Sequence, residues 1–332
     1  MKKRRQFWGR QLWGNIFRIG LSLATLALLW REVGASDVWA VLRAADLVLL
    51  AAAWGLFLVG IVVRTFRWRA LLHGLGLRPP FWQLLRLYLV GGFFNAFLPS
   101  GFGGDVVRVL ELAQGESPPA AVGTVLVDRL AGILSLMALG LMALPFAPPL
   151  PAWLTWTFVA LAGGGLIAGA LLLQGTWLRR ATAWLPDAVS LAGKGAPAQI
   201  YAAVTGCGAR ALGWAVALSM LFNLLNIGVH WLCGRAVGVE VGLGFYFIAT
   251  PLLSLTLLIP ISVGGLGARD IAAQPLFGAV GVGDAAAAGM TLSVYAVSAA
   301  VGLIGGAIYL FEGLRGMTAS LQHRNRRRST DP

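Results

Sequence analysis

Forty-nine consecutive residues, Leu130–Leu178, carry no charged side chain. A helix needs roughly 20 mostly apolar residues to cross the hydrocarbon core of a bilayer. This run is therefore long enough for two membrane spans, which turn back at the proline-rich segment Pro145–Pro151. The segment Gly14–Trp30, which Arg18 interrupts, predicts a first span. Three further uncharged runs bring the prediction to six full spans: Leu47–Val63, Ala211–Gly234 and Ala285–Phe311.

The composition excludes an ordinary soluble enzyme. Hydrophobic residues make up 58% of the chain and charged residues 12%, whereas a soluble domain carries about 25% charged residues. The net charge of +13 can indicate nucleic-acid binding, but the basic residues lie in loops between apolar runs and in a tail without aromatic residues. The sequence therefore predicts an all-α polytopic membrane protein, a single transmembrane domain over residues 1–332, with no nucleic-acid partner.

The distribution of basic residues predicts the orientation of the chain. Segments 31–46 and 145–151 have no excess of basic over acidic residues. Because basic loops stay in the cytoplasm, we expect a multi-pass protein of the plasma (inner) membrane with basic cytoplasmic tails, 1–13 and 315–332. Four segments carry the basic excess and are assigned to the cytoplasmic side: 1–18, 64–86, 175–210 and 312–332.

This orientation leaves two apolar segments that cannot cross the membrane completely. Residues 87–117 must begin and end on the cytoplasmic side, and residues 241–284 must begin and end outside. Both segments are therefore predicted to be re-entrant helical hairpins, which have to pack within protein or line a wet cavity.

The two hairpins share a sequence pattern. Pro99–Arg108 and Pro260–Arg269 both read P-x3-G-G-x3-R, at an offset of 161 positions. Because the two copies are predicted in opposite orientations, we interpret the chain as inverted repeats, about 47–146 and 211–311. Paired Gly/Pro-interrupted segments of this kind mark the substrate site of many transporters.

The broken helices offer chemistry for an anion. Each break starts a half-helix with free N–H groups and a positive dipole end, and Arg108 or Arg269 adds a fork of donors suited to phosphate. The alternative is that Pro and Gly only kink the helices and allow close packing.

Charged residues within apolar segments are the second signal, because they usually face a cavity or a charged partner. Adjacent residues on a helix point in different directions, so Asp128 and Arg129 are predicted to pair with other residues and not with each other. Arg108 is predicted to pair with Asp105. We also expect Asp270 to restrain Arg269. The second repeat has no equivalent of Asp128, so any site is predicted to be asymmetric. A structural ion network near the cytoplasmic interface remains the alternative.

Other residues have simpler interpretations. Cys207 and Cys233 are predicted core residues, and the histidines lack metal-ligand spacing, so no metal or cofactor is expected. Arginines alternating with Phe66 and Trp68 are predicted to form an interfacial anchor or to hold anionic head groups: Arg64, Arg67 and Arg69. Polar residues inside spans are predicted to hydrogen-bond between helices: Asn95, Asn223, Asn226 and His230.

Four ordered motifs resemble the lysylphosphatidylglycerol synthase transmembrane family, also called flippase-like. They are R-x-x-R-W-R-x-L-L at Arg64–Leu72, N-x-x-L-P-S-G-x-G-G-D-x-x-R at Asn95–Arg108, V-D-R at Val127–Arg129 and P-I-S-V-G-G-L-G-A-R-D at Pro260–Asp270. The resemblance covers about residues 14–314. It implies a polytopic bacterial or archaeal membrane protein. One branch of the family moves an aminoacyl-phospholipid to the outer leaflet, and others belong to hopanoid or polyprenyl-linked glycan pathways.

The resemblance carries the family's motif residues over to this chain. The fused soluble synthase domain of the aminoacyl-phospholipid branch is not expected after Leu314, so transfer from aminoacyl-tRNA is not predicted. The residues carried over comprise Pro99 and the predicted substrate-binding set: Asn95, Gly103, Gly104, Asp105, Arg108, Asp128, Arg129, Gly264, Gly265 and Arg269.

These features together predict lipid translocation between leaflets by a protein that is not an enzyme. The anionic head group would bind in a midplane polar cavity, and no nucleotide-binding G-x4-G-K-[ST] motif is present. Expected partners are an anionic phospholipid, an aminoacyl-lipid, a hopanoid or a polyprenyl-linked lipid, with a biosynthetic enzyme as a further candidate. Two alternatives stay open: an intramembrane lipid-modifying enzyme or subunit that uses Asp105, Glu111 and Asp128, and a scaffold for lipid or glycan biosynthesis.

Overall fold

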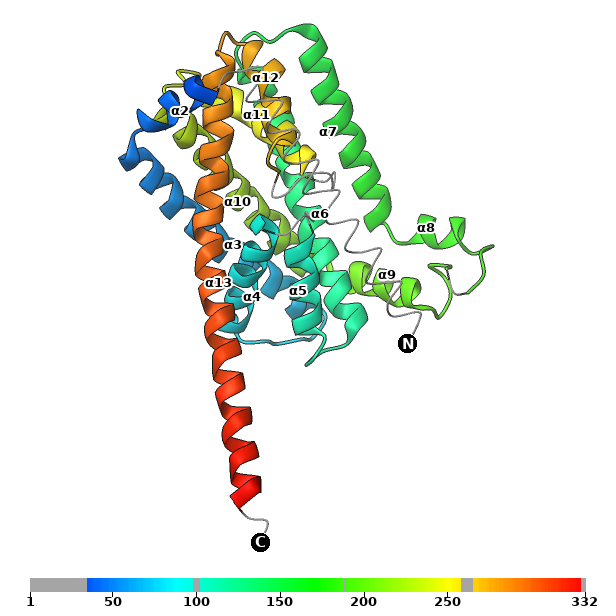
Figure 1. The fold of residues 1–332 in the computed structure, drawn as a ribbon. Coiled ribbons are helices and arrows are strands. Elements are labelled where there is room, and N and C mark those ends of the chain that lie inside the picture. The colour runs from blue at the N-terminus through cyan, green and yellow to red at the C-terminus, as the bar shows by residue number, and fades with distance from the viewer. Residues whose placement is uncertain (1–34, 98–101, 188, 258–264, 330–332) are drawn as a thin grey trace, which may run out of the picture.

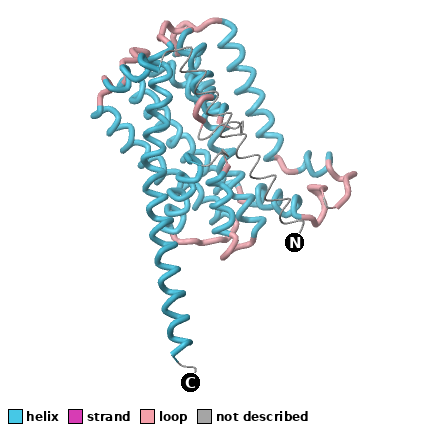
Figure 2. The backbone as a smooth tube through the Cα atoms, viewed as in Figure 1, coloured by secondary structure: helices cyan, strands magenta, loops and turns pink. Residues whose placement is uncertain are grey.

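The structure is a computed structural model that describes residues 35–97, 102–187, 189–257 and 265–329, with side chains up to Glu312. Every regular element in these ranges is helical, and none of them is a strand (Figure 2). The elements are α2 (Ala35–Arg43), α3 (Leu47–Gly74), α4 (Phe81–Phe97), α5 (Gly103–Leu112), α6 (Pro118–Ala143), η1 (Leu144–Phe146), α7 (Ala152–Leu173), α8 (Thr176–Ala181), α9 (Ala196–Gly206), α10 (Ala209–Ala236), α11 (Leu243–Thr256), α12 (Ala268–Gly278) and α13 (Asp284–Ser329).

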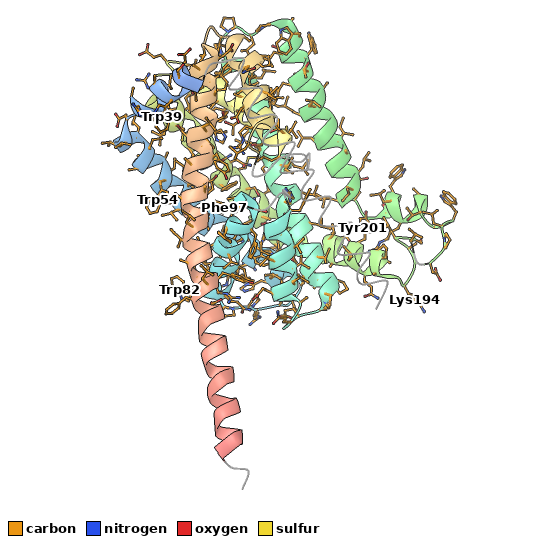
Figure 3. The ribbon with its side chains drawn as sticks, viewed as in Figure 1. Trp39, Trp54, Trp82, Phe97, Lys194 and Tyr201 are labelled. Atoms are coloured by element: carbon orange, nitrogen blue, oxygen red, sulfur yellow. The ribbon has the colours of Figure 1, made fainter. Side chains whose placement is uncertain are left out.

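Five of the described helices are long and apolar enough to cross a membrane: α3, α6 with η1, α7, α10 and the Asp284–Glu312 part of α13. They match five of the six predicted spans, and the sixth, Gly14–Trp30, lies outside the described residues. Exposed Trp39 and Trp82 lie toward opposite ends of the bundle (Figure 3), as expected of tryptophans at the two membrane interfaces. The chain is therefore a multi-pass membrane protein.

Several basic segments lie toward one end of the bundle. The segment 75–80, with Arg78, and helix α8, with Arg179 and Arg180, lie toward the lower end in Figure 1, where α13 also projects beyond the other helices. The turn between η1 and α7 and the loop between α2 and α3 lie at the upper end. The helices α4 and α5 join the rest of the chain at the lower end, whereas α11 and α12 do so at the upper end.

Helices α3 and α10 run antiparallel along their whole length. At one end the backbone N–H of Asp46, just before α3, donates to the carbonyl of Ala236, the last residue of α10. At the other end Gly74 packs so closely on the start of α10 that an added Cβ would overlap the carbonyl oxygen of Cys207. This pair forms the central connection between the two predicted repeats.

The corresponding short helices also pack on opposite halves. Helix α4 runs antiparallel to α13, where Tyr295 donates to the carbonyl of Ala96 and Gly305 faces Leu89. Its counterpart α11 lies against the end of α6, where a Cβ at Gly140 would lie 2.7 Å from the Phe247 carbonyl oxygen. Each predicted repeat therefore contributes one short helix that packs on the long final helix of the other.

One glycine makes the α4–α13 contact especially sensitive to side-chain size. A Cβ at Gly305 would overlap the backbone of Leu89, which cannot move without shifting α4. We expect Gly305→Ala to lower the free energy of unfolding by about 1–3 kcal/mol, because overpacking forces the helices apart. Gly55→Ala is the matched control, since nothing lies within 4 Å of an added Cβ there. Denaturant unfolding of both variants in detergent measures this, and equal stability of the two would contradict the packing.

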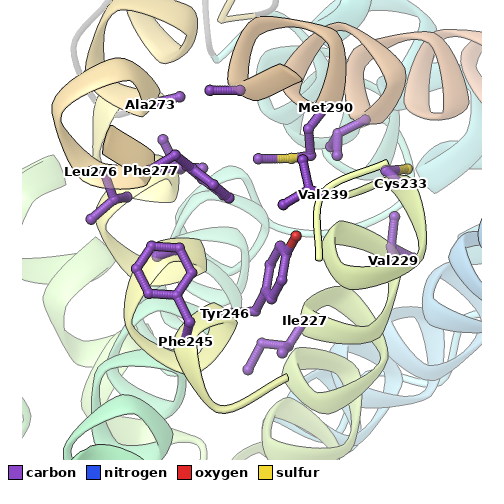
Figure 4. Close-up of a cluster of buried hydrophobic side chains, with 14 of the residues drawn as sticks. Ile227, Val229, Cys233, Val239, Phe245, Tyr246, Ala273, Leu276, Phe277 and Met290 are labelled. Carbon is purple, nitrogen blue, oxygen red and sulfur yellow. The ribbon is translucent and has the colours of Figure 1, made fainter. Parts of the chain in front are cut away.

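The largest described core lies at the upper end and joins α10, α11, α12 and α13 (Figure 4). Phe245 and Phe277 meet edge to face with ring centroids 5.1 Å apart, and Met290 belongs to the same cluster. Both predicted core cysteines are buried, and burial raises the pKa of the Cys207 thiol to about 11. Cys207 and Cys233 are therefore packing residues, as the sequence indicates.

Candidate functional site

The centre of the candidate site is a buried carboxylate on which four helices converge. Asp128 on α6 is 1% exposed and accepts hydrogen bonds from Arg67 Nε on α3 at 2.7 Å and Arg108 Nη2 on α5 at 3.1 Å. The Tyr88 hydroxyl on α4 donates to its second oxygen at 2.5 Å. Since these three donors come from different helices, Asp128 ties α3, α4 and α5 to α6.

A second carboxylate extends the network. Asp105 accepts from Arg108 Nη1 at 3.2 Å and from Arg129 Nη1 at 2.5 Å. Arg108 therefore bridges Asp105 and Asp128 and is only 3% exposed. The predictions that Asp105 pairs with Arg108, and that the adjacent Asp128 and Arg129 pair elsewhere, are confirmed.

Arg67 corrects the sequence interpretation of the arginines on α3. Its predicted place was the interface, but it is 2% exposed, bonded to Asp128, and donates from Nη1 to Ser219 Oγ of α10 at 3.0 Å. The prediction of an exposed interfacial anchor is wrong for Arg67, because this face of α3 turns toward α6 and α10, whereas the neighbouring Phe66 is exposed. The alternative, that these arginines hold anionic head groups, stays a prediction. Arg64, one turn earlier, points to the same interior.

Aromatic rings complete the lining of this cluster. The guanidinium of Arg108 lies 4.0 Å from the ring centre of Tyr88 and 4.1 Å from that of Trp68. The guanidinium of Arg64 lies 5.0 Å from the same Tyr88 ring and 5.1 Å from Phe222. Cation–π contacts of this kind partly stabilise desolvated guanidinium groups, but they supply no acceptor for the N–H donors.

Positive charge exceeds negative charge in this cluster, which we call the arginine cluster. It contains four guanidinium groups, those of Arg64, Arg67, Arg108 and Arg129, and two carboxylates, those of Asp105 and Asp128. Within the described part of the chain, no carboxylate lies within ion-pair distance of Arg64, and the Nε atoms of Arg64 and Arg108 are buried without a hydrogen-bond partner. Buried donors are normally satisfied, so the cluster is suited to an added anion.

The contact between α4 and α5 is made by residues of the first predicted hairpin. Asn95 Oδ1 on α4 accepts from the backbone N–H of Gly104 in the first turn of α5 at 2.7 Å. Gly103 and Gly104 are buried, and a Cβ at Gly104 would overlap the carbonyl of Gly91. Asn95 therefore holds α5 against α4 and occupies one N–H group that was predicted to be free. Pro99 lies outside the described residues.

The described residues of the second predicted hairpin have a different arrangement. Gly265 has a left-handed φ of +87°, and a Cβ there would lie 3.6 Å from Arg269 Nη2, so the guanidinium folds back over this glycine. Asp270 accepts from Gly267 N at 2.9 Å and from the Thr291 hydroxyl, and no ion pair with Arg269 is present in the described ranges. Asp270 therefore caps α12 and does not restrain Arg269 through a direct ion pair, so its predicted restraint of Arg269 stays a prediction.

Arg269 does not join the arginine cluster. Among the described residues, no hydrogen bond or ion pair joins Arg269 to a member of the arginine cluster. Arg269 Nε, like the Nε atoms of Arg64 and Arg108, is buried without a hydrogen-bond partner. The described site residues that were predicted thus fall into three groups: Asp105, Arg108, Asp128 and Arg129 in the arginine cluster, Asn95, Gly103 and Gly104 at the contact between α4 and α5, and Gly265 and Arg269 apart from both. Gly264 lies outside the described residues.

Glu111, a candidate acid–base residue, has a structural partner. It pairs with Arg86 of α4, whose Nη1 also donates to Glu312 Oε2 of α13 at 2.5 Å. This ion-paired group links α4, α5 and α13 at the lower end of the bundle. In the described ranges, no three His, Cys, Asp or Glu side chains are arranged to hold a metal ion.

The fold and the site together define a polytopic helical membrane protein with a buried, net-positive polar cluster between its helices. Comparison with protein families gives a match to the lysylphosphatidylglycerol synthase TM region over residues 15–306. The chain belongs to this family, which links it to lipid metabolism at a membrane. A comparison with curated proteins found no match.

Proposed function

We propose that this protein moves a phosphate-bearing anionic lipid between the two leaflets, with the phosphate bound against Arg64 and Arg108. The observation that carries the proposal is the excess of guanidinium groups in the arginine cluster, together with the two buried Nε–H donors that have no acceptor. Hydrogen bonds between guanidinium and phosphate are charge-assisted and stronger than neutral ones. A phosphate would satisfy both donors and reduce the excess charge.

The depth of the cluster supports an entry site on one side of the membrane. Arg67 lies seven residues before the end of α3, which places it about 10 Å from that end at 1.5 Å per residue. A hydrocarbon core is about 30 Å thick, so its midplane lies about 15 Å from either surface. We therefore propose that the cluster lies closer to the end of the bundle with the basic segments, and not at the midplane that the sequence predicts. With these loops and both termini assigned to the cytoplasm of a plasma (inner) membrane, a head group enters from the inner leaflet.

The arrangement of the helices supports two alternating states. The hairpin α4–α5 joins the bundle from the lower end and α11–α12 from the upper end, and α3 and α10 are antiparallel (Figure 1). We infer that the two repeats are inverted and that both hairpins are re-entrant. In transporters with this design, rocking of one repeat against the other exposes a fixed site to each side in turn.

The charge of the cluster favours some of the candidate lipids over others. Phospholipids, aminoacyl-phospholipids and polyprenyl-linked lipids all contain a phosphate group, which the unpaired donors of Arg64 and Arg108 would bind. A hopanoid hydrocarbon has no phosphate and would leave these donors buried and unsatisfied, which costs about 1–3 kcal/mol for each group. We therefore propose a phosphate lipid as the substrate.

We also propose that the protein itself is not an enzyme. An acid–base mechanism would need Asp105, Glu111 or Asp128 to exchange a proton with substrate, but each of these carboxylates is paired with at least one arginine. A biosynthetic enzyme that supplies the lipid remains a proposed partner.

The proposal is tested with purified protein in vesicles that carry fluorescent phosphatidylglycerol. Dithionite quenches only the fluorescent lipids in the outer leaflet of the vesicle. Translocation of lipids from the inner to the outer leaflet therefore appears as loss of the fluorescence that dithionite otherwise leaves. We expect the fluorescence of phosphatidylglycerol to be lost faster in vesicles with the protein than in empty vesicles. With fluorescent phosphatidylcholine at matched labelling, we expect the protein to increase this rate less. No acceleration for any phosphate lipid would contradict translocation, and an equal rate for both lipids would contradict selection by charge.

A further inference from the structure

A second polar surface lies outside the arginine cluster, between the end of α3 and the beginning of α10. It is a groove of about 730 Å³, and we call it the α3–α10 groove. One wall of the groove is a single face of α3, whose lining residues are spaced three or four apart. The other wall is formed by α10 from its first turn onward. The residues that matter here are Phe66, Arg69, His73, Arg210, Trp214 and Leu218.

We propose that this groove binds an anionic phospholipid, with its phosphate between Arg69 and Arg210. None of the lining residues is acidic, so the groove is basic throughout its polar part. Neither arginine forms an ion pair within the described residues, and Arg69 Nε is buried without a hydrogen-bond partner. The groove therefore has positive charge and an unsatisfied donor, and only an outside acceptor can satisfy them.

The groove also changes from polar to apolar along the helices, as a phospholipid does. His73 and Arg210 lie at the end of α3 and the start of α10, whereas Phe66 and Leu218 lie about two turns further along, roughly 10 Å away. Phe66 and Trp214 are 44% and 57% exposed, so they offer an uncovered apolar wall. A head group at the polar end would place the acyl chains along this wall.

The first turn of α10 adds a further attraction for phosphate. Gly208 precedes this helix with a φ of +80° and no side-chain cap, so the first N–H groups of α10 are not satisfied by a capping residue. Gly208 to Ala211 all line the groove. Free N–H groups and the positive end of a 28-residue helix favour an anion at this place.

A lipid fits the groove better than a soluble phosphate compound because of its apolar half. A small phosphate compound would contact the arginines and leave Phe66 and Trp214 uncovered. Basic pockets between spanning helices commonly bind anionic lipid head groups. The site is independent of translocation, since it shares no residue with the arginine cluster.

The test compares lipid binding by wild type and Arg69→Gln/Arg210→Gln in nanodiscs or by native mass spectrometry after detergent purification. Each arginine near an anionic membrane surface contributes about 1 kcal/mol, so we expect about thirty-fold weaker binding of one phosphatidylglycerol molecule. Binding of phosphatidylcholine should not change. Arg180→Gln is the matched control, because this exposed arginine of α8 lies outside the groove. Arg69→Lys/Arg210→Lys should retain most of the binding.

A second readout reports on the apolar half. Brominated phosphatidylglycerol should quench the fluorescence of Trp214, measured as the difference between wild type and Trp214→Phe, and the double glutamine variant should lose this quenching.

Three outcomes would overturn the proposal. They are unchanged phosphatidylglycerol binding in the double variant, an equal loss in Arg180→Gln, or competition by soluble glycerol phosphate as strong as by the lipid. The result is separate from translocation. A variant of the groove can lose bound lipid while translocation by the arginine cluster persists, and a variant of the arginine cluster can lose translocation while the groove still binds lipid.

Discussion

Arg64→Gln should slow translocation of phosphatidylglycerol by about ten- to a hundred-fold and leave the protein folded. Arg64 has no carboxylate partner in the described part of the chain, so its removal breaks no ion pair. A hydrogen bond to a charged group contributes about 1.5–3 kcal/mol, which sets the expected loss if Arg64 binds phosphate. The vesicle assay measures the rate, and thermal unfolding in detergent measures the stability.

Arg43→Gln is the matched control for this experiment. Arg43 also lies over an aromatic ring, 5.0 Å from the centre of Trp39, but it is exposed and lies on α2, away from the cluster. Its replacement should change neither rate nor stability. If Arg64→Gln transports at the wild-type rate, the cluster is a structural ion network and not a binding site. Loss of transport together with loss of folding would assign Arg64 a structural role, which contradicts its role in phosphate binding.

Asp128→Asn should give the largest loss of stability of any single substitution in the cluster. The change leaves Arg67 and Arg108 buried without the carboxylate that both of them contact. Removal of one partner from a buried ion pair costs about 3–5 kcal/mol, because the remaining charge is uncompensated. Denaturant unfolding of purified protein measures the difference, with exposed Asp187→Asn as the control that should change stability by less than about 0.5 kcal/mol.

A double variant separates charge compensation from side-chain packing. Adding Arg67→Met to Asp128→Asn removes the arginine that is left without a carboxylate partner, whereas Arg108 still pairs with Asp105. We expect the double variant to recover part of the stability lost in Asp128→Asn alone. If the two losses simply add, the interaction between Arg67 and Asp128 carries no coupling energy and the account of the cluster is wrong.

The spans could be predicted from the sequence because their signal is the length of uncharged runs, which does not depend on tertiary contacts. Leu130–Leu178 predicts two helices and a turn, and the structure has α6 and α7 with the turn between them. The structure ends α4 at Phe97 and begins α5 at Gly103, and it ends α11 at Thr256 and begins α12 at Ala268, as the Pro- and Gly-containing sequence between them predicts. Inverted repeats and re-entrant hairpins remain inferences, supported by the antiparallel α3–α10 pair.

The candidate site could be predicted only in part. Asp105 and Arg108 lie three apart on a helix, and Asp128 and Arg129 are charges in an apolar run, so local rules identify them. Arg67 and Tyr88 were missed because α3 and α4 are apolar on all sides, and such helices give no periodic signal for the face that is buried. For the α3–α10 groove, Arg69 was predicted as a residue that could hold an anionic head group, but the α10 wall was missed, since the two walls lie more than 130 positions apart in the sequence.

The most direct measurement of the central claim is the distance between lipid phosphorus and arginine nitrogen. Solid-state NMR with ¹⁵N-labelled arginine detects ³¹P–¹⁵N dipolar coupling in membranes of phosphatidylglycerol. Arg69→Gln/Arg210→Gln serves as the background, because it removes the signal of the α3–α10 groove. We predict coupling in this background, and its loss when Arg64→Gln is added. Absence of coupling in the background, or coupling that Arg64→Gln leaves unchanged, would contradict phosphate binding in the arginine cluster.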